Sequence, residues 1–130
     1  MSRSLEGPEL AAYASVCPTE HLRRVSVTQV RWLPNGASGV TLRHHVLVRR
    51  DDDRTGSRRL LAHELVHVRQ FAEWGTAGFL RRYVSDYVRA RRVHRRHHAA
   101  YLAIPFEIEA RAEAEDWHKS VGEPLPKRGQ

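Results

Sequence analysis

The chain has 130 residues, a formal net charge of +7 and an apolar content of 41%. This length predicts a single domain, residues 1–130, with a modest core, and no apolar run approaches the roughly 20 residues that a membrane-spanning helix needs. The single cysteine, Cys17, excludes an internal disulfide framework. The excess of basic residues permits attraction to nucleic acid, an anionic membrane or an acidic protein, but it does not indicate a fold.

Both ends of the chain, residues 1–8 and 121–130, are predicted to be loose tails. The first tail has no apolar signal-peptide segment, so we expect a cytoplasmic protein, unless a dedicated secretion or injection system exports it without a cleaved signal. A short helix over residues 8–16 is expected next, because Pro8 suits the first turn of a helix.

Residues 24–50 carry the pattern of β-strands. β-Branched side chains are frequent, and valines alternate with polar residues over residues 24–31. A Pro-Asn-Gly turn signal at residues 34–36 separates this segment from a second strand-like run over residues 40–48. The pattern predicts an antiparallel hairpin, and it allows the 40–50 stretch to be split into two strands. We therefore expect a small antiparallel sheet before the first long helix.

Three helices are expected after the sheet, which makes the fold class α+β. The first runs from about Arg58 to Glu73. The second covers residues 76–98, with an apolar stripe on one face and arginines between Arg81 and Arg96 over the rest. The third runs over residues 106–119, directly after a proline, and it is rich in glutamate and alanine.

The first of these helices contains the sequence His63-Glu64-Leu65-Val66-His67. Residues four apart lie on one helical face, so both imidazoles project from the same stripe, as two nitrogen ligands of one zinc ion require. The carboxylate of Glu64 is rotated off that stripe but stays within reach of a water molecule activated by the metal. The motif therefore predicts a zinc site with Glu64 as general base.

Catalytic zinc usually takes three protein ligands, so a third must come from elsewhere in the chain. Glu73 follows the motif closely, but Gln70 stands where a glycine would let the chain turn, and a continuing helix carries Glu73 away from the metal. His94 and His98 share a helical face in a segment crowded with arginines, whose charge repels a cation. Neither of these positions is favoured.

His44 and His45 occupy adjacent strand positions and face opposite sides of a sheet, so at most one of them could point at the metal. The last helix is the favoured source. Small alanines in this helix would allow another helix to approach closely. Its carboxylates stand at positions Glu107, Glu109, Glu113 and Glu115. A carboxylate with two imidazoles is a known zinc ligand set for hydrolysis. Spacing alone does not choose between Glu107 and Glu109.

Residues 60–115 resemble the gluzincin group of zinc metallopeptidases, because the His63-Glu64-x-x-His67 motif is followed about 40 residues later by Phe106-Glu107-x-x-Ala110. In several gluzincins the third ligand is the glutamate of an E-x-x-A-[DN] helix. The resemblance implies a minimal zincin-like domain in which Glu107 is that ligand. The same segments resemble small uncharacterised bacterial zincin domains, some of which are attached to contractile injection systems.

The resemblance has two open points and hardly extends to residues 1–55. Arg111 stands where Asp or Asn often supports a ligand histidine in this group. Glu109 remains the alternative ligand, because Glu109-Ala110-x-x-Glu113 also resembles a gluzincin E-x-x-x-[DE] helix.

The expected function is zinc-dependent hydrolysis of peptide bonds. Zn²⁺ would be held by His63, His67 and Glu107, with Glu64 as the base. Tyr101, just before the ligand helix, is the candidate donor to the developing oxyanion. The predicted hairpin would offer an edge to an extended peptide or protein substrate.

Two other functions stay open. The chain could be a zinc-bearing module without turnover, associated with a toxin or serving as a scaffold. It could also be a basic nucleic-acid-binding protein that uses the Arg81–Arg96 face for an anionic partner, although exposed aromatic residues are not interleaved with those arginines.

Overall fold

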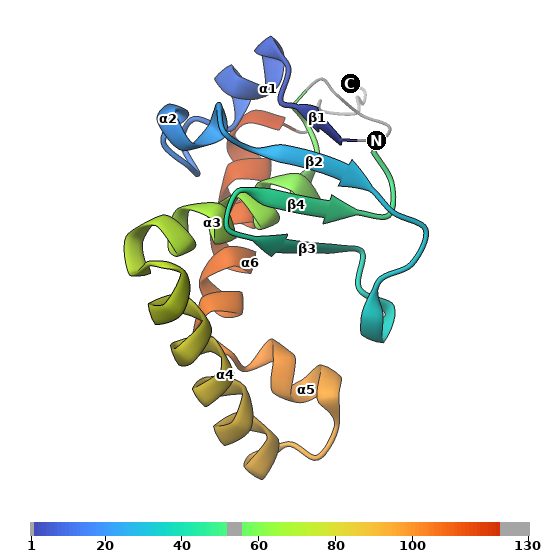
Figure 1. Cartoon of the computed structure of the whole chain (residues 1–130), viewed down its shortest axis with the longest axis vertical. Helices are drawn as coiled ribbons and strands as arrows, with labels where there is room; N and C mark the ends of the chain where they lie inside the picture. Colours follow the sequence, from blue (N-terminus) through green and yellow to red (C-terminus); the bar gives the residue numbers. More distant parts are fainter. Residues whose placement is uncertain (1, 52–55, 123–130) are drawn as a thin grey trace.

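The computed structural model describes residues 2–51 and 56–122 and has the α+β fold that the sequence predicts (Figure 1). Within these residues, a four-stranded sheet is packed with six α-helices and two short helical turns. In chain order the elements are β1 (Ser2–Ser4), α1 (Gly7–Ala12), α2 (Thr19–Leu22), β2 (Ser26–Gln29), η1 (Pro34–Gly36), β3 (Gly39–Leu42), β4 (His45–Val48), α3 (Arg59–Trp74), α4 (Thr76–Val93), α5 (His97–Leu102), α6 (Pro105–Trp117) and η2 (His118–Gly122).

The sheet is mixed, not antiparallel, with strand order β1-β2-β4-β3. The predicted hairpin between residues 24–31 and 40–48 is wrong, because β2 and β4 are parallel neighbours. The second run instead folds back on itself. Arg43, at a φ of 58°, turns the chain between β3 and β4, which pair antiparallel. The predicted division of the 40–50 stretch is therefore correct, while the Asn-Gly signal forms the η1 turn in a longer connection.

The N-terminus is not the loose tail that the sequence predicts. β1 pairs antiparallel with β2 and forms one edge of the sheet, and α1 begins at Gly7. Arg3 fixes this segment, since its guanidinium contacts the carboxylate of Glu9 at 2.7 and 2.9 Å and that of Asp51 at 2.8 and 2.9 Å. At the other end, residues 121–122 complete η2, and residues 123–130 of the second predicted tail lie outside the described residues.

Helix α3 lies between the sheet and α6 (Figure 1). Valines of β2 and β4 cover one side of it, and small or aromatic residues of α6 cover another. This cluster contains Val27, Val46, Val48, Leu61, Leu65, Val66, Val68, Ala110, Ala114 and Trp117. Because Ala110 and Ala114 are small and buried, α6 approaches α3 closely, as its alanine content predicts. The helix with the His-Glu-His motif is thus held on several sides.

Helices α4 and α5 extend below the sheet as a pair in Figure 1. The predicted helix over residues 76–98 is interrupted, because α4 ends at Val93 and α5 begins at His97, so His94 and His98 do not share one helical face. A second cluster of Phe71, Phe79, Ile104 and Phe106 joins α4 to α3 and to the start of α6. Among the helices of the described ranges, none is both long and apolar enough to cross a membrane.

Candidate metal centre

The structure brings His63, His67 and Glu107 together. The two histidines lie one turn apart on α3, and Glu107 stands in the first turn of α6, directly after Pro105. The Nε2 atoms of His63 and His67 lie 3.0 and 3.1 Å from the same oxygen, Oε1 of Glu107. One potential ligand atom from each residue falls within 4.8 Å of the other two, so the group could hold a metal ion.

Glu109 does not reach this group. Its side chain is about half exposed and accepts a hydrogen bond from Gln70 Nε2 at 2.6 Å, and it lies 3.6 Å from the guanidinium of Arg69. Glu73 also pairs with Arg69, at 3.6 Å, on an exposed part of α3. Both residues therefore belong to an ion-pair cluster around Arg69, and Gln70 lies between Glu109 and His67.

The three grouped residues form a strongly coupled charge cluster. Burial alone would raise the pKa of Glu107, but hydrogen bonds from His63 and His67 outweigh it and hold that pKa well below its ordinary value. Burial would likewise lower the pKa of His67, but the hydrogen bond and charge of Glu107 raise it to about 9. A buried carboxylate that faces two imidazoles provides the oxygen and nitrogen ligand atoms of a zinc site. A bound cation would take the place of the protons in the hydrogen bonds between Glu107 and the two imidazoles.

Gln70 orients the second histidine. Its Oε1 can only accept, so the 2.7 Å contact means that Nδ1–H of His67 donates and that Nε2 faces Glu107. The amide nitrogen of Gln70 donates in turn to the carbonyl of Phe106 at 3.2 Å. Gln70 is fully buried. The motif does not single out this residue, although its position three residues after His67 places it on the same helical face.

Tyr83 orients the carboxylate of Glu107. Its hydroxyl donates to Oε2 of Glu107 at 2.6 Å, on the oxygen that does not contact the histidines. Burial, together with the nearby charge of Glu107, raises the pKa of Tyr83, so the phenol keeps its proton. In the sequence Tyr83 is one residue of the apolar stripe on α4, and no local signal distinguishes it from its neighbours.

Glu64 lies beside the two histidines, under strand β3. The hydroxyl of Thr41 donates to its Oε1 at 2.8 Å and to its backbone carbonyl at 3.1 Å. Gly39 also contacts it closely, since a Cβ at position 39 would lie 3.0 Å from Oε2. Burial raises the pKa of Glu64, and this effect exceeds the opposing influence of the imidazoles. A carboxylate with a raised proton affinity suits a general base.

These residues open into one cavity of about 970 Å³. Its walls come from the η1–β3 segment, α3, α4, α5 and α6, and the lining includes both histidines with Glu64, Tyr83, Tyr101 and Glu107. Burial and the nearby charge of Glu107 raise the pKa of Tyr101. The rings of His97 and His98 each stack 6.4 Å from the ring of Tyr101, measured between centroids. The sequence-predicted oxyanion donor thus lies in the same cavity as the predicted ligands.

The other histidines that the sequence offers lie elsewhere. His44 contacts His21 at the opposite end of β3, with Nδ1 of His21 3.3 Å from Nε2 of His44, in a separate small depression. His45 is exposed on β4. His94 follows the end of α4 and does not line the cavity.

Comparison with known protein families gives one match. Residues 28–75 match the family described as the eCIS core domain, which links this part of the chain to extracellular contractile injection systems. The match runs from β2 to the end of α3 and includes His63, Glu64 and His67, but it stops before Glu107. No curated protein and no solved structure matches the chain.

Proposed function

We propose that this chain is a zinc-dependent metallopeptidase. The observation that carries the proposal is the convergence of His63, His67 and Glu107 from two packed helices, with Glu64 beside them in the same cavity. Two imidazoles, one carboxylate and an adjacent second carboxylate form the residue set of zinc hydrolases that use a glutamate base.

The proposed mechanism assigns metal binding to three of these residues and proton transfer to the fourth. His63, His67 and Glu107 would hold Zn²⁺, which supplies Lewis acidity that activates water and polarises a carbonyl. Glu64 takes the proton of the attacking water and passes it to the leaving amine. The hydrogen bond from Thr41 directs the carboxylate of Glu64 during this transfer.

The oxyanion that develops on the peptide carbonyl needs a hydrogen-bond donor, and we propose a tyrosine hydroxyl for this role. Two phenols lie among the described residues of the cavity wall, those of Tyr83 and Tyr101, and both interact with Glu107. The hydroxyl of Tyr83 is held by a short hydrogen bond to Oε2 of Glu107, at 2.6 Å. We assign Tyr101 the donor role, with His97 and His98 packed behind its ring.

The substrate we propose is an extended peptide. β3 is the edge strand opposite β1, and Gly39, Val40 and Thr41 of this strand line the cavity above Glu64. An edge strand offers unpaired backbone groups to a peptide that adds to the sheet. The match of residues 28–75 supports delivery by a contractile injection system as the route of export.

The test compares the zinc-loaded wild-type protein with Glu64→Gln on a fluorescent casein and on a peptide library. We expect cleavage by the wild type, and a loss of at least about 100-fold in Glu64→Gln, because general-base catalysis contributes about 10²–10⁴-fold. The variant should keep one zinc per chain, since Glu64 is not a ligand. Zinc binding without cleavage of any substrate would favour the module without turnover, and cleavage that survives the substitution would remove Glu64 from its role.

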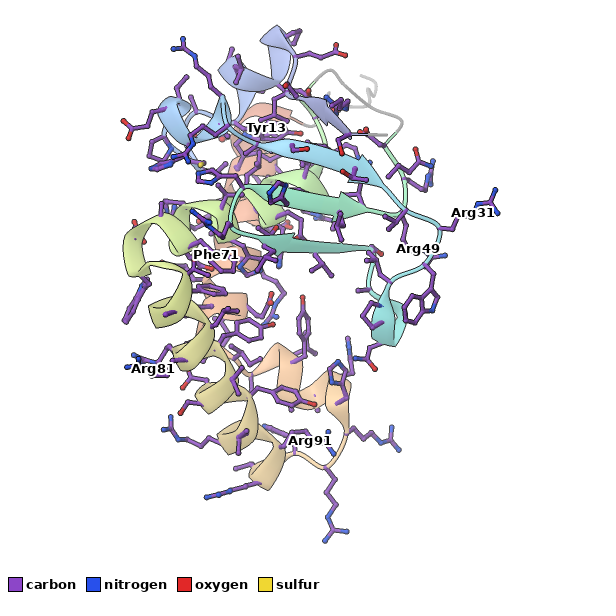
Figure 2. The ribbon with its side chains drawn as sticks, viewed as in Figure 1. Tyr13, Arg31, Arg49, Phe71, Arg81 and Arg91 are labelled. Atoms are coloured by element: carbon purple, nitrogen blue, oxygen red, sulfur yellow. The ribbon has the colours of Figure 1, made fainter. Side chains whose placement is uncertain are left out.

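A second candidate function rests on the arginines of α4. Arg82 and Arg89 share the buried carboxylate of Asp86, whereas Arg81 and Arg92 have no ion pair with any described residue. Arg81 points away from the body of the protein in Figure 2. Such a face supports an anionic partner. Binding to DNA that weakens steeply with salt and does not depend on zinc would favour this function.

A further inference from the structure

Arg111 lies one helical turn beyond the ligand Glu107 on α6 and lines the same cavity. Its Nη2 donates to the carbonyl of Leu102, the last residue of α5, at 2.7 Å. Its Nη1 is shielded from solvent and has no hydrogen-bond partner among the described residues. A shielded donor without a partner is unusual in a folded protein and calls for an explanation.

The charge of Arg111 is also uncompensated. The guanidinium makes no ion pair within residues 2–51 and 56–122, whereas Arg59, on the same cavity wall, contacts Glu115 at 2.6 Å. The two other carboxylates of the lining, those of Glu64 and Glu107, already face imidazoles or hydroxyls. Among the described residues of the lining, none neutralises Arg111.

A structural role does not account for the guanidinium. The carbonyl of Leu102 needs one neutral donor, while an arginine brings five N–H groups and a permanent charge. Arg111 and the proposed oxyanion donor, Tyr101, line the same cavity. Arg111 thus lies in the wall of the cavity that holds the proposed metal site, and among the described residues its guanidinium has both a free hydrogen-bond donor and an unneutralised charge with which to bind an anion.

We propose that Arg111 determines substrate specificity by binding a carboxylate of the peptide. This proposal rests on the metallopeptidase function proposed above. A planar guanidinium binds a carboxylate through two parallel hydrogen bonds, and a turn of the side chain presents Nη1 to the ligand. Two sources carry this group: the side chain of Asp or Glu next to the scissile bond, and the C-terminal carboxylate of the substrate.

The experiment uses hydroxamates, which anchor on zinc, with the zinc-loaded full chain. The first pair, N-acetylglutamic acid α-hydroxamate and its glutamine counterpart, carries or lacks a side-chain carboxylate. The second pair, N-(3-hydroxycarbamoylpropanoyl)alanine and its alaninamide counterpart, carries or lacks a C-terminal one. We expect the acid of one pair to bind the wild type roughly tenfold more tightly than its amide, from the strength of charge-assisted hydrogen bonds.

In Arg111→Gln this preference should disappear while the affinity for the amides stays the same. A merely structural arginine would weaken acid and amide alike. Arg111→Lys keeps the positive charge but loses the paired N–H donors of the guanidinium, so it should retain part of the preference. This variant provides a folded comparison if the glutamine variant is unstable. Preference in the first pair alone assigns an internal acidic residue, and preference in the second pair alone assigns the C-terminus.

Two negative outcomes are separable. If all four probes bind the wild type in a zinc-dependent way but acids and amides bind equally, the proposed role of Arg111 is overturned. Zinc binding at the proposed site remains supported in that case. If no probe shows zinc-dependent binding, the metal centre itself is overturned, and the role of Arg111 falls with it.

Discussion

Gln70 should set both the stability of the metal-free protein and its affinity for zinc. The substitution Gln70→Met keeps the length of the side chain but removes its acceptor and its donor. It leaves Nδ1–H of His67 without a partner in a buried site, whereas the carbonyl of Phe106 keeps its hydrogen bond within helix α6. The carboxylate of Glu109 also loses a contact, but it is about half exposed and can be hydrated instead.

The size of both effects follows from these contacts. A buried group left unpaired costs about 1–3 kcal/mol, so the loss of the partner of Nδ1–H of His67 predicts a fall of about 1–3 kcal/mol in the free energy of unfolding. For zinc, removal of a partner that orients a ligand histidine weakens affinity by about 10- to 100-fold. That range corresponds to about 1.4–2.7 kcal/mol of binding free energy.

The assay combines denaturant unfolding of the metal-free protein with zinc competition against a fluorescent chelator. Leu22→Ala is the matched control, because Leu22 is fully buried on α2, outside the cavity lining. It should lose at least as much stability as Gln70→Met, about 2–5 kcal/mol, yet bind zinc in its folded state as the wild type does. Wild-type zinc affinity in folded Gln70→Met would refute the orienting role of Gln70.

Three further predictions concern single contacts. Tyr83→Phe removes the donor to Oε2 of Glu107 and should weaken zinc binding about tenfold, measured by the same competition; an unchanged affinity would contradict the orienting role. Gly39→Ala pushes the carboxylate of Glu64 by a few tenths of an ångström and should lower turnover roughly tenfold, with metal analysis still giving one zinc; equal turnover would show that the carboxylate tolerates the shift. The pKa of Glu113 is lowered, chiefly by its hydrogen bond to a guanidinium on α3, so its stabilisation is present above the ordinary value of 4.5 and is lost as the pH falls below it. Glu113→Gln should therefore lower the free energy of unfolding by about 1 kcal/mol or less at pH 7, and the difference from wild type should vanish in acid; a difference independent of pH would contradict this.

Local periodicity predicts the part of the site that lies on one element. The pair His63 and His67 follows from helical spacing alone, and α3 begins and ends within a residue of the prediction. The third ligand is not local. Spacing leaves Glu107 and Glu109 equivalent, and the resemblance to gluzincins favours Glu107. In the structure, α6 packs on α3 through Ala110, which turns Glu107 toward the histidines and Glu109 toward Arg69.

What the sequence does not predict depends on contacts between distant segments. The parallel pairing of β2 with β4 is decided by where the second strand-like run turns, at Arg43, and no propensity at that position signals a turn. β1 is held by Arg3 through carboxylates that lie far apart in the sequence. Tyr83 reaches Glu107 only because α4 folds back beside α6, so its role is visible only in three dimensions.

The metal centre is tested most directly by a crystal structure of the zinc-loaded protein, with anomalous data collected at the zinc edge. We predict one zinc within about 2.0–2.2 Å of Nε2 of both His63 and His67 and of a carboxylate oxygen of Glu107. A protein that takes up no zinc, or a zinc whose ligands do not include Glu107, would contradict it.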